Sequence, residues 1–168
     1  VLFLLFCAIF PQALTQYDPI EQNLRDRFAA PSAEHFFGTD EYGRDIFSRV
    51  IYGCRTSMEI GLISVAISCI IGVVIGAIAG FYGGITDNLF MRFIDVLMAI
   101  PNTLLGISIV AALGNSIPNL IIALSIGSIA GYARVVRVSV LSTKGTEYVE
   151  AAYATGASDF RIIFKYIL

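Results

Sequence analysis

The stretch "SVAISCIIGVVIGAIAG", residues 64–80, decides the fold of this chain. Small residues recur in it at every fourth position, at Ser64, Ser68, Gly72, Gly76 and Gly80. Side chains four positions apart share one face of a helix, and a stripe of small ones lets a second helix backbone approach closely. Chance is the alternative, since glycine is common in membrane helices. The unbroken run of matches favours a tight helix–helix contact.

The whole sequence has the composition of a membrane protein. Of its 168 residues, 57% are hydrophobic and only 14% are charged, whereas soluble domains carry about 25% charged residues. The mean hydropathy is +0.77. A net charge of -2 offers no basic surface for nucleic acid, so nucleic-acid binding is excluded. The sequence also lacks zinc-protease, serine-hydrolase and P-loop motifs, which argues against a membrane enzyme or an ATPase.

Three apolar segments, at about 58–82, 93–114 and 119–138, are expected to cross the bilayer in an all-α, polytopic membrane fold. Residues 1–16 are interpreted as the end of an earlier, truncated span. A signal peptide is the alternative, but no basic segment precedes the apolar run. Residues 17–57 form a polar extramembrane loop, in which Ile46, Phe47, Val50 and Ile51 would share one face of a short amphipathic segment.

Further features of the spans predict local structure. Pro101 removes a backbone hydrogen bond and predicts a kink. Arg92 and Asp95 lie three residues apart near the edge of a span, which favours an interfacial ion pair over a place in a substrate path. Gly127 and Gly131 repeat the small-residue spacing, so we expect the last span to pack closely as well.

No metal or disulfide site is predicted. His35 is the only histidine, and the acids near it, Asp40, Glu41 and Asp45, show no defined ligand spacing. The odd number of cysteines and their wide separation indicate packing residues at Cys7, Cys54 and Cys69. Basic residues are divided almost evenly between the two sides of the expected spans, so the positive-inside rule does not fix the orientation.

The C-terminal stretch "EYVEAAYATGASDFRIIFKYIL", residues 147–168, reads as helix, turn and helix. Gly156 suits a left-handed helix end, Ser158 is placed to cap the second helix, and Asp159 adds negative charge to its first turn. In that helix an apolar stripe follows the i, i+3, i+4, i+7 pattern and must be covered: Phe160, Ile163, Phe164 and Ile167. An interfacial helix that merely seals the bundle is the alternative.

The segment "EAAYATG", residues 150–156, resembles the EAA loop of the permease subunits of bacterial ABC importers. Glu150, Ala151, Ala152 and Gly156 match its pattern, and Leu168 falls on the later leucine, whereas Tyr166 replaces an isoleucine. Two longer stretches, "HFFGTDEYGRDIFSRVIYGCRTS" (35–57) and "GFYGGITDNLFMRFIDVLMAIPNTLL" (80–105), are similar to the second permease subunit of dipeptide, oligopeptide and nickel importers.

This resemblance implies that residues 58–168 belong to the transmembrane domain of a type I ABC importer in the bacterial inner membrane. The permease would form a pathway for peptides, or alternatively for nickel or another small solute. A channel that works without an ATPase is the more distant alternative.

The resemblance also implies partners and residue roles. A second permease subunit, cytoplasmic ATP-binding subunits, an extracytoplasmic substrate-binding protein and the lipid bilayer are the expected partners, and no cofactor is implied. Residues of about 142–168 would form the cytoplasmic loop that couples to the ATPase. Glu150 would hold this loop by polar contacts, Ala151 and Ala152 would keep its surface small, and Gly156 would set the angle between its helices. Ser158 and Asp159 would begin the second helix.

Overall fold

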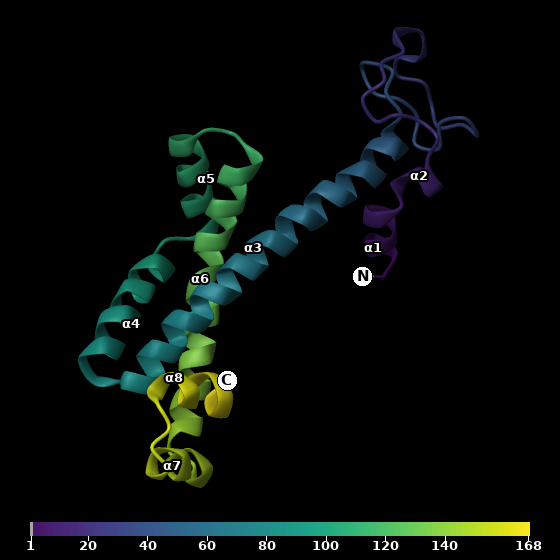
Figure 1. Ribbon diagram of the computed structural model, residues 1–168. Helices are drawn as coiled ribbons and strands as arrows, with labels where there is room; N and C mark the ends of the chain where they lie inside the picture. The colour runs from purple at the N-terminus through teal and green to yellow at the C-terminus, as the bar shows by residue number, and fades with distance from the viewer. Residues whose placement is uncertain (1) are drawn as a thin grey trace. The chain divides into compact units, whose positions relative to one another are not determined.

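The computed structural model describes residues 2–168 and is all-α (Figure 1), which confirms the predicted fold class. The helices are α1 (Leu2–Ile9), α2 (Pro11–Leu14), η1 (Leu24–Asp26), α3 (Ile46–Tyr82), α4 (Gly84–Ala99), α5 (Asn102–Leu113), α6 (Ile117–Lys144), α7 (Glu147–Ala154), α8 (Asp159–Arg161) and η2 (Ile162–Ile167). The chain forms two compact units, one ending at Leu62 and one from Ile63 to Leu168.

Two helices, α3 and α6, are each long and apolar enough to cross a membrane. The pair α4 and α5 meets the same criteria only when the two helices are taken together, and they are bent by 87° at the break between them. The described residues therefore supply two crossings, or three if the bent pair makes one.

Helix α3 begins at Ile46, well before the expected start of the span near residue 58. The Asp45 carboxylate accepts hydrogen bonds from the amide and the hydroxyl of Ser48, each at 2.7 Å, and so caps the helix. No proline follows before Ser57. The expected amphipathic segment is therefore the first part of α3, with Ile51 buried and Val50 exposed.

The turn between α3 and α4 is very short. Gly83 and Gly84 have φ values of +65° and +56°, which reverse the chain within two residues. Residues 86–88 already belong to the first turns of α4. Asp87 there is favourably placed at the positive end of the helix.

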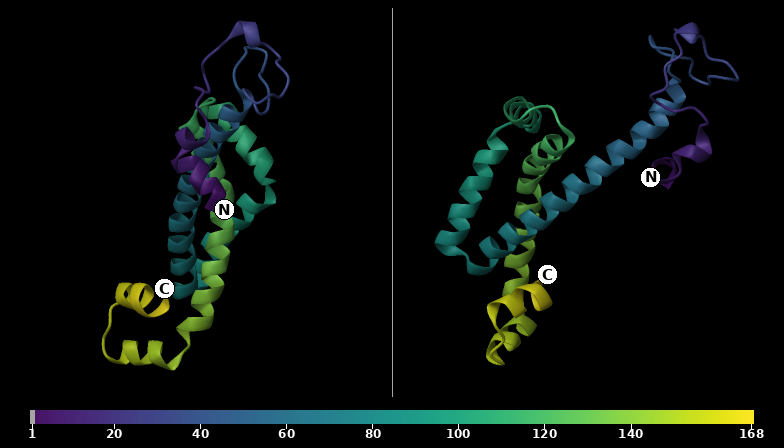
Figure 2. Two further views of the ribbon diagram at one scale, coloured as in Figure 1. Left: turned by 90° about the vertical axis from the view of Figure 1, so that its right-hand side faces the viewer. Right: turned by 45° about the horizontal axis from the view of Figure 1, so that its top comes forward.

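The stripe of small residues on α3 contacts α6 (Figures 1 and 2). A Cβ atom added to Gly72 would lie 2.5 Å from the Cβ of Tyr132, and one added to Gly80 would lie 2.9 Å from the Cβ of Val140. One added to Gly76 would meet the carbonyl oxygen of Ala133 at an impossible distance. Because residue numbers increase in the same direction along both helices at the contact, α3 and α6 pack as a parallel pair and not an antiparallel one.

The part of this contact nearer to the amino ends of α3 and α6 is polar. The Ser68 hydroxyl donates to the carbonyl of Ser125 at 2.9 Å, and the Ser125 hydroxyl reaches the carbonyl of Ser64 at 3.3 Å. The Ser64 hydroxyl lies 3.5 Å from the carbonyl of Ile121. All of these serines are buried, so hydrogen bonds join the two helices where the stripe changes from glycine to serine.

The glycines of α6 do not form a second stripe of this kind. A Cβ atom at Gly127 would lie 3.5 Å from the Asn102 side chain, an ordinary contact, and one at Gly131 would meet nothing within 4 Å. Their spacing is correct, but they lie out of phase with the face that carries Ser125, Ala133 and Val140. Side chains on that face contact α3 instead.

The kink predicted at Pro101 is confirmed as a complete break between α4 and α5. Pro101 has φ of -54° and ψ of 129° and precedes the first residue of α5. Its missing amide cannot continue the hydrogen bonds of α4, and Ile100 before it is held in an extended conformation. The segment expected at 93–114 is therefore parts of two helices.

Replacing Gly76 by leucine should weaken the α3–α6 contact. The new side chain would collide with the backbone of α6, which cannot move aside, and overpacking typically costs about 1–3 kcal/mol. We expect a lower melting temperature in detergent for Gly76→Leu. Gly61→Leu is the matched control, because a Cβ atom on Gly61, also in α3, meets nothing within 4 Å. Equal stability of the two variants would contradict the close contact.

Candidate functional site

The C-terminal residues form a helical hairpin, α7 to η2, whose turn is built around Gly156. This glycine has φ of +77°. Its amide donates to the Tyr153 carbonyl at 2.9 Å, and the Ala157 amide donates to the Ala152 carbonyl at 3.1 Å. This pair of bonds is a Schellman motif, which requires the left-handed conformation that glycine adopts without strain. The helix end predicted at Gly156 is confirmed.

One side of the hairpin packs on the ends of the two long helices. Val149 and Ala152 of α7 and Ile162 and Ile163 near the C-terminus form a buried cluster with three residues of the long helices, Ala77 and Phe81 of α3 and Val140 of α6. The hairpin, α3 and α6 therefore share one buried apolar contact.

The apolar stripe predicted for the second helix differs in the structure. Ile163 is buried as expected, but its neighbour Ile162 is buried with it, while Phe160 and Phe164 are 71% and 53% exposed. The last six residues of this segment are a π-helix, in which the Leu168 amide donates to the Ile163 carbonyl at 2.9 Å. The wider turn changes which residues share a face, so a period of 3.6 residues does not apply.

The other side of the hairpin is open. The rings of Phe160 and Phe164 lie with their centroids 4.5 Å apart. Several of the predicted coupling residues are exposed as well: Glu150, Ala151, Gly156, Ser158 and Asp159. Ser158 stands at the cap position, but its side chain makes no capping bond, and its carbonyl accepts from the Ile162 amide at 2.9 Å. The hairpin thus has exposed aromatic rings on its second helix and exposed carboxylates at Glu150 and Asp159.

Polar contacts fasten the same ends of the bundle. The Lys144 ammonium donates to the Phe81 carbonyl and lies 5.6 Å from the centroid of the Phe81 ring. The Arg137 guanidinium donates two hydrogen bonds to the Asp87 carboxylate, which ties α6 to the first turn of α4. Paired bonds between a guanidinium and a carboxylate fix orientation as well as distance.

The ion pair expected between Arg92 and Asp95 is not present in the described part of the chain. Asp95 instead accepts a hydrogen bond of 2.6 Å from Arg134 of α6. Adjacent turns of one helix bring Arg92 and Asp95 near each other, but the packing of α4 on α6 gives Asp95 a cation on the facing helix. Sequence spacing within one span does not contain this information.

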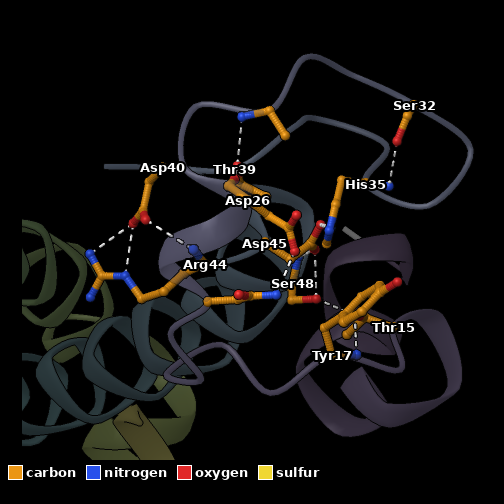
Figure 3. A network of polar contacts seen from close by, with 12 residues as sticks. Thr15, Tyr17, Asp26, Ser32, His35, Thr39, Asp40, Arg44, Asp45 and Ser48 are labelled. Carbon is orange, nitrogen blue, oxygen red and sulfur yellow. Dashed lines mark hydrogen bonds and ion pairs between the residues drawn. The ribbon is translucent and has the colours of Figure 1, made fainter. Parts of the chain in front are cut away.

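A second polar network lies in the unit that ends at Leu62 (Figure 3). The His35 ring approaches the Asp45 carboxylate at 3.0 Å, and Ser48 is hydrogen-bonded to both Asp45 and Thr15. Burial acts to raise the pKa of Asp45, but the hydrogen bonds from Ser48 and His35 outweigh it and lower that pKa. The network holds the polar loop on the start of α3.

Asp40 forms a separate cluster in this loop with Arg44 and Arg49, at 2.7 Å and 2.5 Å. Burial acts to raise the pKa of Asp40, but hydrogen bonds from the Arg44 side chain and from the amides of Arg44 and Tyr42 lower it to about 2. Across residues 2–168, no three His, Cys, Asp or Glu side chains are grouped so that they could hold a metal ion.

Comparison with known proteins finds one family. Residues 72–168 match the family described as binding-protein-dependent transport system inner membrane component. The dipeptide transport system permease protein DppC of Alkalihalophilus pseudofirmus is 45% identical over 96% of this chain and 53% of its own length. The glutathione transport system permease protein GsiD of Pectobacterium atrosepticum is 41% identical over 100% of this chain and 56% of its own.

A third relative is the oligopeptide transport system permease protein OppC of Bacillus subtilis, 39% identical over 100% of this chain and 55% of its own length. The chain therefore spans about half the length of the curated relatives that it matches.

Replacing Gly156 by alanine should loosen the hairpin turn. No neighbour lies within 4 Å of a Cβ atom there, so the only penalty is the left-handed backbone, about 1–2 kcal/mol. We expect faster hydrogen exchange in residues 157–163. Gly145→Ala, at φ of -91° with equally open surroundings, is the control. Gly156→Asn should fall between the two, and equal exchange in all three variants would refute the backbone argument.

Replacing Asp40 by asparagine should loosen the loop around Arg44. Because the pKa of Asp40 falls from 3.8 to about 2 on folding, its contribution to stability is complete above about pH 4 and is lost as the pH falls toward 2. Asp40→Asn should show faster hydrogen exchange at Tyr42 and Arg44 at neutral pH. Glu41→Gln, a neighbouring exposed acid, is the control and should leave exchange unchanged.

Proposed function

Because the chain belongs to the family of binding-protein-dependent transport system inner membrane components, we propose that it is a permease subunit of an ATP-driven peptide importer. On this proposal it forms the translocation pathway together with a second permease subunit. Cytoplasmic ATP-binding subunits supply the energy, and a substrate-binding protein delivers the solute from outside. The names of the three relatives, which cite a dipeptide, glutathione and an oligopeptide, support a peptide as the solute.

The observation that carries the proposal is the hairpin α7 to η2, which has one face in the bundle core and one face open. Such an element can pass a displacement from an external partner to the spans, because packed elements move as units between discrete arrangements. Three of the residues that match the EAA pattern, Glu150, Ala151 and Gly156, are exposed. Ala152, the remaining match, is buried in the cluster with α3 and α6.

The open face has the chemistry of a docking surface. Two exposed aromatic rings, Phe160 and Phe164, would be costly to leave in water, and aromatic residues are frequent binding hot spots. We propose that they insert into a cleft of the ATPase and that Glu150 and Asp159 make polar contacts around them. Closure of the ATPase would then shift the hairpin, and with it the paired helices α3 and α6.

The orientation of the chain follows from this assignment. If the hairpin faces the cytoplasm, the ends of α3 and α6 at Tyr82 and Lys144 lie on the cytoplasmic side. The amino end of α3, capped by Asp45, then lies on the outer side with the polar loop attached to it. That loop would be within reach of the substrate-binding protein.

Reversing the charge of Glu150 should uncouple transport from ATP. In the full-length protein with its partners, we expect Glu150→Lys to reduce ATP-dependent peptide uptake by roughly tenfold or more, as expected for a lost contact of about 1.4 kcal/mol. Membrane insertion should be unchanged, since Glu150 is exposed and lies outside the bundle core.

Glu147→Lys is the matched control. Glu147 is also exposed and also lies in the first turn of α7, so both variants lose the same favourable interaction with the helix dipole. Normal uptake in Glu150→Lys, or equal losses in both variants, would refute the role of Glu150. Uptake that needs no ATP would favour a channel instead.

A further inference from the structure

The bundle formed by residues 63–168 has two exposed faces of different character. On α3, every exposed side chain between residues 63 and 74 is apolar: Ile63, Val65, Ala66, Ile70, Ile71 and Val74. A face of this kind suits the hydrocarbon of a bilayer, which offers neither donors nor acceptors.

The exposed surface of α4 and α6 is mixed: it carries charged and polar side chains among apolar ones such as Leu89, Phe93 and Val135. Exposed Asn88, Arg92 and Asp95 follow one another on α4 at the i, i+4, i+7 spacing of a helix face. The ion pair between Asp95 and Arg134 joins this row to α6, and its side chains are 63% and 48% exposed. Charged groups exposed within a membrane-crossing segment are rare and face a protein interior or a water-filled cavity.

The break between α4 and α5 lies on the same part of the bundle, beside the middle of the apolar segment 58–82 of α3. Asn102, the first residue of α5, lies against Gly127. Gly127 lies between two residues of α6 that contact α3. Ser125 is hydrogen-bonded to Ser68, and Tyr132 lies against Gly72. Residues 68–72 are in the middle of the apolar segment 58–82, so the break is level with the middle of that span.

Non-helical backbone at this depth needs polar surroundings. Within the described chain, neither the Asn102 side chain nor the first amides of α5 have a hydrogen-bond partner. Irregular backbone is tolerated inside a membrane only where protein buries it or where it lines a water-filled cavity. An open pocket of about 530 Å³ lies here. Its lining is mixed, with the polar Asn102, Ser128 and Tyr132 beside apolar and small residues: Met98, Ile100, Pro101, Gly127, Ala130 and Gly131.

We propose that the polar groups of this surface, Asp95, Asn102, Ser128 and Arg134, which we call the polar face, line the water-filled pathway of the transporter, whereas the exposed face of α3 lies against lipid. The inference rests on the proposed function for the existence of a pathway, but the choice of face comes from exposure, depth and polarity. The ion pair and the Asn102 amide then contact water and the solute in transit.

The test measures how fast single cysteines react with a charged, membrane-impermeant thiol reagent. It uses the full-length protein in its assembled transporter, with Cys7, Cys54 and Cys69 replaced by alanine. Asn102→Cys and Ser128→Cys report on the polar face, and Val65→Cys and Ile70→Cys are controls on the exposed face of α3. We expect modification at the first two sites to be at least about tenfold faster than at the controls.

Equal rates at all four positions, or no reaction at Asn102→Cys and Ser128→Cys, would overturn the proposal; the second result would mean that another protein surface covers this face. Gly131→Cys provides a further site if the Asn102 variant does not assemble, since a Cβ atom there meets nothing within 4 Å. The rates require no peptide and no ATP. Fast labelling without peptide uptake would therefore reject the peptide assignment and retain the pathway face.

Discussion

The approach of the α3 and α6 backbones is the constraint on which the rest of the structure depends. Inside a bilayer, apolar side chains gain little by leaving lipid, so helices associate where their backbones can touch and where hydrogen bonds can form between them. Gly72, Gly76 and Gly80 remove the side chains that would keep α6 away, and Ser68 bonds to Ser125 where the glycines end. The hairpin then has a fixed pair of helix ends on which to pack.

Much of this arrangement is predictable from sequence because it depends on residues that strongly restrict the local backbone conformation or helix packing. Gly156 at a helix end, Pro101 within an apolar run and a repeat of small residues each specify backbone geometry directly. The partner face of α6 is different. No sequence pattern marks Ala133 and Val140 as residues that contact α3. Gly131 does follow the small-residue spacing, yet a Cβ atom added there would have no neighbour within 4 Å.

The candidate site shows the same division. The turn between α7 and the second helix follows from Gly156, whereas the residue pattern does not reveal the π-helix at Ile162–Ile167, in which Ile162 and Ile163 are buried and Phe164 is exposed. Likewise, Asp95 has a potential partner in its own helix, yet tertiary packing gives it Arg134 of α6. Pairs between elements depend on the relative placement of helices, which the spacing along one helix cannot encode.

The parallel course of α3 and α6 has an electrostatic consequence. Each helix ends with unpaired carbonyls equivalent to about half a negative charge, and parallel packing brings two such ends to the same side of the bundle. Two basic residues near this side are already bound: the Lys144 ammonium donates to the Phe81 carbonyl at the end of α3, and the Arg137 guanidinium donates to the Asp87 carboxylate. Lys144 thus neutralises the end of a helix, and Arg137 neutralises a carboxylate. The positive-inside rule counts both as free positive charges, so it overestimates their weight in deciding the orientation. Because the carboxyl ends of both helices lie on the side of the hairpin, basic residues there are stabilised by the helix dipoles, whichever side of the membrane the hairpin faces.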